Sequence, residues 1–177
     1  MLKRILMSAA AVMLLSALAA CGDGKEATAN IHAISAAGVG DMIGTVRAHD
    51  GAEGLVMEIE IAGLAPGPHG LHVHENGDCG PGLKDGQTVA GLAAGGHYDP
   101  QATGVHEGPK GAGHLGDLPV LIADGSGMAA AVIVAPRLSV ADIRGRALVI
   151  HEGGDNFSDS PAPLGGGGAR IACGVVN

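Results

Sequence analysis

The sequence predicts an all-β protein, a Greek-key β-barrel or sandwich of about eight antiparallel strands with two long functional loops. Short apolar segments recur along the chain, and glycine and aspartate turn signals separate them. No segment has a convincing helical period, although 138–143 is ambiguous. With one Tyr, one Phe and no Trp, the core must be built from Val, Ile, Leu, Ala and Met, which suit closely packed strands.

The segment 55–61, LVMEIEI, has the clearest strand pattern. Its residues alternate between apolar and polar types, which places Glu58 and Glu60 on the solvent face of a half-buried strand. Before it, the sequence GVGD at 38–41 is a turn signal between two shorter segments. The other expected strands are 31–36, 42–48, 120–123, 128–134, 147–151 and 169–176.

The first 20 residues have the pattern of a signal peptide, with Lys3 and Arg4 before an apolar run too short for a typical membrane span. The run ends in LAAC, which resembles a bacterial lipoprotein signal and implies a lipid-modified Cys21 at the N-terminus after cleavage. The alternative is an ordinary signal peptide that leaves Cys21 as a free thiol. We therefore expect a periplasmic protein with a lipid-anchored linker at 21–29 and one domain at 30–177.

The residue after the expected lipidation site is Gly22, and inner-membrane retention usually has Asp there, so the outer membrane is favoured. Loss of Lys3 and Arg4 takes the formal net charge from −8 to −10. Such an acidic chain with so few aromatic residues is not expected to bind nucleic acid.

The chain has three cysteines, an odd number for an exported protein. If lipidation occupies Cys21, then Cys79 and Cys173 remain as a pair, and a disulfide between them would close a long loop. Two buried free thiols are the alternative, which is unusual outside the cytoplasm.

Two glycine-rich insertions, 76–117 and 152–168, are far longer than hairpin loops need, and such loops are usually functional or disordered. The first insertion has almost no hydrophobic periodicity that could bury its polar residues as core. It contains three histidines and an aspartate that would suit a tetrahedral zinc site: His97, His106, His114 and Asp117.

A second group of histidines lies on predicted strands. In the sequence GPHGLHVHENGDC at 67–79, His72 and His74 are two residues apart and share one face if the segment is a strand. His151 ends the predicted strand ALVIH and could join them over the same face of the sheet. Three or four imidazoles in a tetragonal arrangement suit copper.

Other features are expected to be structural. The odd spacing of His69 from His72 places it on the other face, as a hydrogen-bonded histidine. We expect His32 and His49 to be ordinary surface residues. The glycine run at 165–168 contains no phosphate-loop lysine and is expected to allow a close backbone approach.

Five motifs stand out along the chain: GPHGLHVHENGDC at 67–79, GGHYDP at 95–100, HLGDLP at 114–119, HEGGDN at 151–156 and PLGGGGARIACGV at 163–175. These motifs closely resemble those of the bacterial copper-zinc superoxide dismutases, and the resemblance covers nearly all of the chain after residue 29. Leu71 stands where that family commonly has Phe, a change expected to affect packing.

The resemblance implies a copper site and a zinc site that share the imidazolate of His97. The implied copper ligands are His72, His74, His97 and His151. The implied zinc ligands are His97, His106, His114 and Asp117. It further implies that Asp155 links a copper histidine to a zinc histidine, that Cys79 pairs with Cys173, and that Arg170 lines the substrate channel.

The implied activity is dismutation of superoxide to oxygen and hydrogen peroxide by one-electron cycling of copper, with protection against extracytoplasmic superoxide. Because the chain is acidic, Arg170 is expected to supply local positive charge, and Lys84 either extends it or is a solvated loop residue. A copper-buffering protein is the alternative, and it would need neither the zinc site nor Arg170. A zinc hydrolase would need an open zinc position, which four protein ligands do not leave. The sequence leaves monomer and homodimer open.

Overall fold

The computed structural model describes residues 26–177. The expected signal peptide, Cys21, Gly22 and the first part of the expected linker lie outside the described residues. The main sheet has seven antiparallel strands in the order β5-β10-β11-β1-β2-β3-β9. Its strands are β1 (Glu26–Ser35), β2 (Gly38–Gly51), β3 (Gly54–Ile61), β5 (Leu71–His74), β9 (Ala129–Ala135), β10 (Ala147–His151) and β11 (Arg170–Val175).

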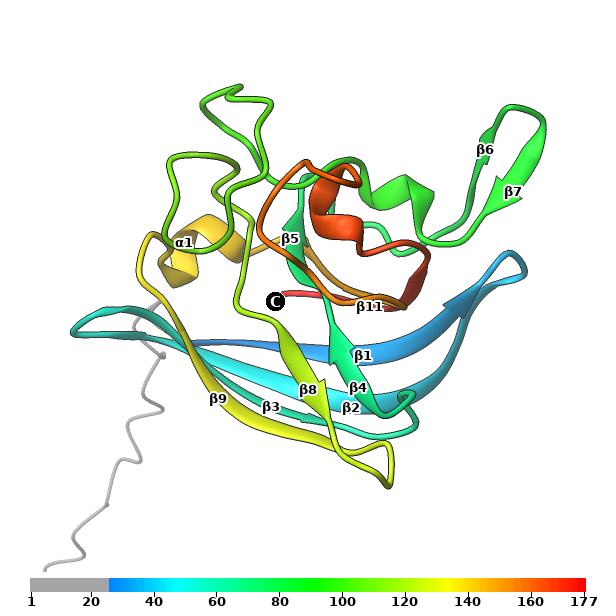
Figure 1. The fold of residues 1–177 in the computed structure, drawn as a ribbon. Helices are drawn as coiled ribbons and strands as arrows, with labels where there is room; N and C mark the ends of the chain where they lie inside the picture. The colour runs from blue at the N-terminus through cyan, green and yellow to red at the C-terminus, as the bar shows by residue number, and fades with distance from the viewer. Residues whose placement is uncertain (1–25) are drawn as a thin grey trace, which may run out of the picture.

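Two further strand pairs complete the fold. β4 (Gly67–His69) pairs with β8 (Leu121–Ala123), and β6 (Gly82–Lys84) pairs with β7 (Gln87–Val89). The main sheet curls, and the β4–β8 pair lies across from β1, β2 and β3 (Figure 1). The space between these layers is the aliphatic core, so the all-β barrel expected from the sequence is confirmed.

The core is built by alternation along the strands. In β3, Leu55, Met57, Ile59 and Ile61 are each at most 1% exposed, while Glu58 and Glu60 face solvent as predicted. Each such aliphatic side chain contributes about 1.5–3 kcal/mol through burial. Leu71, at the position where an aromatic residue was expected in the family, is also buried, which agrees with a packing role.

The first hairpin differs from the sequence prediction. Its turn lies at Ala36 and Ala37, and the expected turn at 38–41 belongs to β2. The reason is that Gly38, with φ of 121°, takes the backbone back into the strand, and register shifts near His32 accommodate the extra residues.

The barrel also starts earlier than the expected domain boundary at residue 30. β1 begins at Glu26, and Ala27 and Ala29 are 4% and 2% exposed. Thr28 exchanges backbone hydrogen bonds with Asn177, the last residue of the chain. Residues 26–29 are therefore strand, because their small apolar side chains alternate into the core.

The ambiguous segment at 138–143 contains a single helical turn, α1 (Val140–Ile143). Ser139 donates its backbone N–H and its hydroxyl to the carboxylate of Asp142, which fixes the start of the turn. Within residues 26–177 there is no helix long and apolar enough to cross a membrane.

Both long insertions lie over the end of the barrel near β5 and β11 (Figure 1). The first contains the β6–β7 hairpin and a 3₁₀ turn at Leu92–Ala94, and the second contains a 3₁₀ turn at Leu164–Gly166. The disulfide between Cys79 and Cys173 ties the first insertion to β11, as the sequence predicted.

Candidate metal centre

Seven titratable side chains, six histidines and one aspartate, are buried together where the two insertions meet β5 and β10. His72 and His74 extend from β5 on the face opposite the core residue Val73, and their backbones form isolated bridges with Asp117 and His97. Each of the seven is at most 7% exposed: His72, His74, His97, His106, His114, Asp117 and His151. Such a cluster is costly to bury unless its polar atoms have partners.

One ring nitrogen of each of the six histidines is buried and has no hydrogen-bond partner. In four residues these nitrogens are Nδ1 of His72 and Nε2 of His74, His97 and His151. These four residues can each offer a ligand atom within 4.8 Å of the others. This all-imidazole set is the one expected to bind copper.

In three of these four histidines, the opposite ring nitrogen is held by an acceptor, which fixes the tautomer. His72 Nε2 donates to Asp155 Oδ2 at 2.8 Å. His74 Nδ1 donates to the Gly95 carbonyl at 3.0 Å, and His151 Nδ1 donates to the Gly168 carbonyl at 3.2 Å. Each unpartnered nitrogen is therefore left with a free lone pair that can bind a metal.

A second group of donor atoms surrounds Asp117. Its Oδ1 lies 3.0 Å from His97 Nδ1 and 3.5 Å from His114 Nδ1, and its Oδ2 lies 3.0 Å from His106 Nδ1. The His106 and His114 nitrogens have no hydrogen bond despite these short distances. A tetrahedral ion with bonds of about 2.0–2.1 Å holds its ligands about 3.3 Å apart, so these separations suit zinc.

By distance alone, His72 could replace His114 in this second group. Ligand-type atoms of four residues lie within 4.8 Å of one another: His72, His97, His106 and Asp117. However, Nε2 of His72 is already bonded to Asp155, and its free Nδ1 belongs with the copper-type set. His114 Nδ1 is free and faces Asp117. We therefore place His114, and not His72, in the second group.

Asp155 connects the two groups from the second insertion. Its two carboxylate oxygens accept hydrogen bonds from His72 Nε2 at 2.8 Å and from His106 Nε2 at 2.7 Å. The backbone N–H of Phe157 also donates to Asp155, at 2.7 Å. One carboxylate thus orients a histidine of each group.

The two groups differ in charge. Burial lowers the pKa of His97 to about 4 and that of His151 to about 3, so both rings are neutral at physiological pH. Burial also opposes protonation of His106, but the Asp117 and Asp155 carboxylates outweigh it and raise the pKa of His106 to about 9. Burial alone would raise the pKa values of Asp117 and Asp155. Hydrogen bonds from the histidines outweigh this effect and hold both carboxyl pKa values below their usual range.

Arg170 lies beside the copper-type group and is bonded to the first insertion. Its Nη1 and Nη2 donate to the carbonyl oxygens of Gly91 and Gly95, each at 2.6 Å. The Gly95 carbonyl also accepts the bond from His74. Burial lowers the pKa of Arg170, but a guanidinium stays charged at neutral pH. The residue therefore has a structural role in holding the loop, and its charge lies near the copper-type group.

Sequence reasoning about the remaining histidines holds. His69 is 1% exposed, and its two ring nitrogens lie 2.7 and 2.8 Å from the carbonyl oxygens of His151 and Ala65, so it is a hydrogen-bonded structural residue. His32 and His49 lie on β1 and β2 at partly exposed positions away from the cluster.

Two arginines that hold the metal loops were not found by sequence reasoning. Arg137 donates to the carbonyl oxygens of Gly113 and His114, and Arg146 stacks on Tyr98. No local pattern marks them, because their acceptors are backbone carbonyls far away in the sequence.

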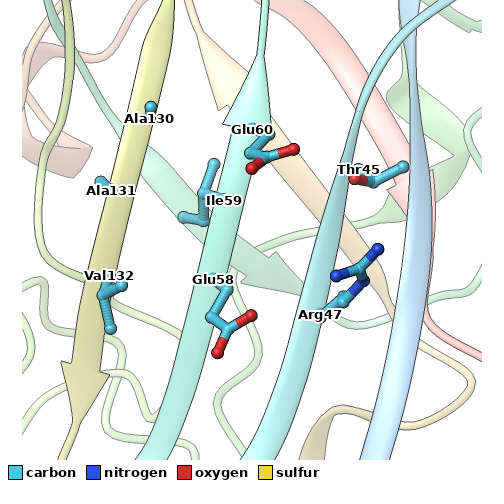
Figure 2. Close-up of a pocket in the computed structure, with 8 residues that line it drawn as sticks. All are labelled: Thr45, Arg47, Glu58, Ile59, Glu60, Ala130, Ala131 and Val132. Carbon is cyan, nitrogen blue, oxygen red and sulfur yellow. The ribbon is translucent and has the colours of Figure 1, made fainter.

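A surface hollow of about 320 Å³ lies on the outer face of β2, β3 and β9, on the opposite side of this sheet from the core (Figure 2). It is lined by Thr45 and Arg47 on β2, Glu58 and Glu60 on β3, and small side chains such as Ala130 on β9. None of the buried histidines lines it, so the metal centre lies elsewhere.

Comparison with known proteins agrees with the two-site geometry. The family model described as copper/zinc superoxide dismutase (SODC) matches residues 42–176. The chain belongs to this family. Superoxide dismutase [Cu-Zn] 2 of Salmonella typhimurium is 51% identical over 162 residues, which cover 90% of this chain and 94% of the relative.

Two solved structures share the fold. The Cu/Zn superoxide dismutase from Brucella abortus has a TM-score of 0.85 and 49% identity, over 86% of this chain and 100% of that chain. The monomeric copper, zinc superoxide dismutase from Salmonella enterica has a TM-score of 0.77 and 52% identity, over 86% of this chain and 99% of that chain. The family's metals, copper and zinc, therefore match the donor types of the two groups of side chains.

Proposed function

We propose that this chain is a copper-zinc superoxide dismutase that converts superoxide to oxygen and hydrogen peroxide. The observation that carries the proposal is that two groups of buried donor atoms share one ring, that of His97, whose Nε2 is unpartnered and whose Nδ1 lies 3.0 Å from Asp117 Oδ1. A mononuclear site would not need both nitrogens of one buried histidine to face other ligand-type atoms.

The copper ligands are assigned to residues with free imidazole nitrogens, and the zinc ligands to those around Asp117. The copper set is His72, His74, His97 and His151. The zinc set is His97, His106, His114 and Asp117. When bound, copper supplies the one-electron couple that oxidises one superoxide and reduces the next, and zinc supplies a fixed, redox-inert charge.

The protein's part in the reaction is to hold the copper-group histidines in fixed orientations, with His97 and His151 unprotonated. His97 Nε2 is the atom at which a proton can be held between the two half-reactions, because Nδ1 of the same ring faces the Asp117 carboxylate at 3.0 Å. Asp155 keeps His72 and His106 in fixed tautomers, and Gly95 does the same for His74. These bonds limit reorganisation of the ligands during turnover.

Arg170 is proposed to attract and dock the substrate anion. The chain has a formal net charge of −8, so its mean field repels superoxide. The guanidinium lies beside the Gly95 carbonyl that orients His74, which places positive charge next to the copper group. Its bonds to the loop carbonyls hold that charge in place, so its structural role and its steering role coexist.

Copper buffering is the weaker alternative. A buffer needs neither four donor atoms around Asp117 nor a carboxylate that links the two groups, and this chain has both. The assignment of the chain to the dismutase family also favours turnover.

Export and anchoring are proposed from the sequence. The apolar run before Cys21 and the disulfide between Cys79 and Cys173 both fit a periplasmic protein held by an N-terminal lipid at the outer membrane. Expression of the full chain with labelled palmitate is expected to label the parent and leave Cys21→Ser unlabelled. Equal labelling of both would refute lipidation at this residue. Sedimentation of the purified domain separates monomer from homodimer.

The dismutase proposal is tested by counting both metals and measuring superoxide decay on the same sample. His74→Ala is expected to abolish dismutation with zinc retained, because His74 belongs only to the copper set. Asp117→Ala is expected to lose zinc and stability while part of the copper-dependent activity remains. Equal losses of zinc, copper and activity in both variants would contradict the division of ligands. Absence of turnover in the fully loaded parent would favour copper buffering.

A further inference from the structure

We propose that Arg146 is a positioning residue for the copper site, which holds in place the residue after His74 and the residue after His97. The inference rests on the proposed function, because it concerns how two of the assigned copper ligands are kept in register. Arg146 itself immediately precedes β10, outside both ligand sets.

The side chain of Arg146 makes three contacts at once. Its Nη1 donates to the Glu75 carbonyl at 2.8 Å, and its Nε donates to the Asp142 carbonyl at 2.8 Å. Its Cζ lies 3.6 Å from the centre of the Tyr98 ring, which is a cation–π stack. Glu75 follows His74 and Tyr98 follows His97, so one guanidinium contacts both neighbours of the ligand pair.

The two contacted segments are bonded to each other directly beside the ligands. Glu75 N–H donates to the Gly96 carbonyl, and Gly96 N–H donates to Glu75 Oε2, each at 3.0 Å. Tyr98 N–H donates to the Val73 carbonyl at 2.8 Å. The backbone pairing of β5 with the loop therefore runs through the residues that Arg146 contacts, and it continues in the bond from Asn76 N–H to the Ala94 carbonyl at 2.9 Å.

Arg146 is anchored well enough to impose a position. Its backbone N–H donates to the Ile143 carbonyl at 3.0 Å, and its carbonyl accepts from Val176 N–H at 2.9 Å. The side chain thus extends from a fixed point between α1 and the last residues of the chain. Arginine suits this task because its flat face stacks on an aromatic ring while its edge donates to a carbonyl.

Two nearby arginines provide comparisons. Arg137 donates to the carbonyl oxygens of Gly113 and His114, so it holds the zinc side of the loop. Arg144 is two residues from Arg146, and its Nη2 donates to the Glu26 carbonyl on β1. No contact between Arg144 and the metal loops is found in the described part of the chain, which makes it a matched control for the loss of one arginine.

The test compares Arg146→Met, Arg146→Lys and Arg144→Met in zinc-loaded protein. Copper(II) affinity is measured by chelator competition, and the geometry of bound copper by its electron paramagnetic resonance spectrum. We expect Arg146→Met to bind copper(II) about tenfold more weakly and to have an altered spectrum. Tenfold is the lower end of the loss in metal affinity that is typical when a residue that orients a ligand is replaced. Arg146→Lys keeps a donor and a cation but loses the flat face that stacks on Tyr98, so it is expected to recover only part of the affinity. Arg144→Met is expected to match the parent.

Tyr98→Leu is a second variant that removes the stacked ring and leaves the bond of Arg146 to Glu75. It is expected to shift the copper spectrum in the same direction as Arg146→Met, by a smaller amount, and it keeps the proposal testable if Arg146→Met does not fold. Tyr98 is the only tyrosine in a chain without tryptophan. The near-ultraviolet circular dichroism of the parent and of the Arg146 variants therefore reports on the surroundings of the Tyr98 ring.

Parent-like copper affinity and spectrum in Arg146→Met, or in Tyr98→Leu if only that variant folds, would overturn the proposal. Equal weakening by Arg146→Met and Arg144→Met would also overturn it, because the effect would then be general destabilisation. These outcomes are separate from the dismutase proposal, which fails only if the fully loaded parent does not turn over superoxide.

Discussion

Reduction of the disulfide between Cys79 and Cys173 is expected to lower the free energy of unfolding of the metal-free protein by about 3–5 kcal/mol. The two cysteines are 94 residues apart, so the bond closes a long loop in the unfolded chain. The chain-entropy relation assigns about 4.7 kcal/mol to a loop of this length. For a domain of about 150 residues this corresponds to a fall in Tm of about 10–15 °C.

The structure indicates which contacts remain after reduction. Cys173 is fully buried on β11, and Cys79 packs against Ile34 and Ala94 in a small apolar cluster. The bonds of Arg170 to the loop carbonyls do not need the disulfide. The native loop should therefore stay docked at moderate temperature, while the unfolded chain gains the freedom that the crosslink removed.

The assay is urea unfolding of metal-free protein with and without a thiol reductant, with the free thiols counted in each sample. Metal-free protein is required because bound zinc and copper stabilise the native state and would mask the change. The variant Cys79→Ala/Cys173→Ala provides a control that the reductant does not affect. Identical midpoints for oxidised protein, fully reduced protein and this variant would refute the entropic argument.

Three further predictions concern the metal centre. Asp155→Asn is expected to lower the affinity for both metals by about 10–100-fold, because one carboxylate orients His72 and His106. Parent-like affinities in chelator competition would contradict this. Gly165→Ala places a methyl group against Asp155 at a φ of 68° and is expected to cost about 1–3 kcal/mol; an unchanged unfolding midpoint would show that the loop adapts. Arg170→Glu is expected to slow dismutation at low salt and to reverse its dependence on ionic strength at full metal occupancy; the parent's salt profile would place the steering elsewhere.

The sequence alone determined the class of fold and the chemical types at the site. The run ALVIH at 147–151 is a short apolar segment that became a fully buried strand, and the alternation in 55–61 has a period of two and became a strand whose faces are as predicted. The pair His72 and His74 shares a face for the same reason. The first glycine-rich insertion lacks hydrophobic periodicity yet contains three histidines, and it indicated a metal site because so polar a segment is ordered more easily around an ion.

The tertiary structure decided which ring nitrogen of each buried histidine has no hydrogen-bond partner. His72 presents Nδ1 while His74 presents Nε2, because the acceptor for one is Asp155 and for the other is the Gly95 carbonyl, in different insertions. The contacts of Arg137 and Arg146 with the loops were likewise absent from any local pattern. Backbone carbonyls carry no sequence signature, and which of them an arginine reaches depends on how distant segments pack.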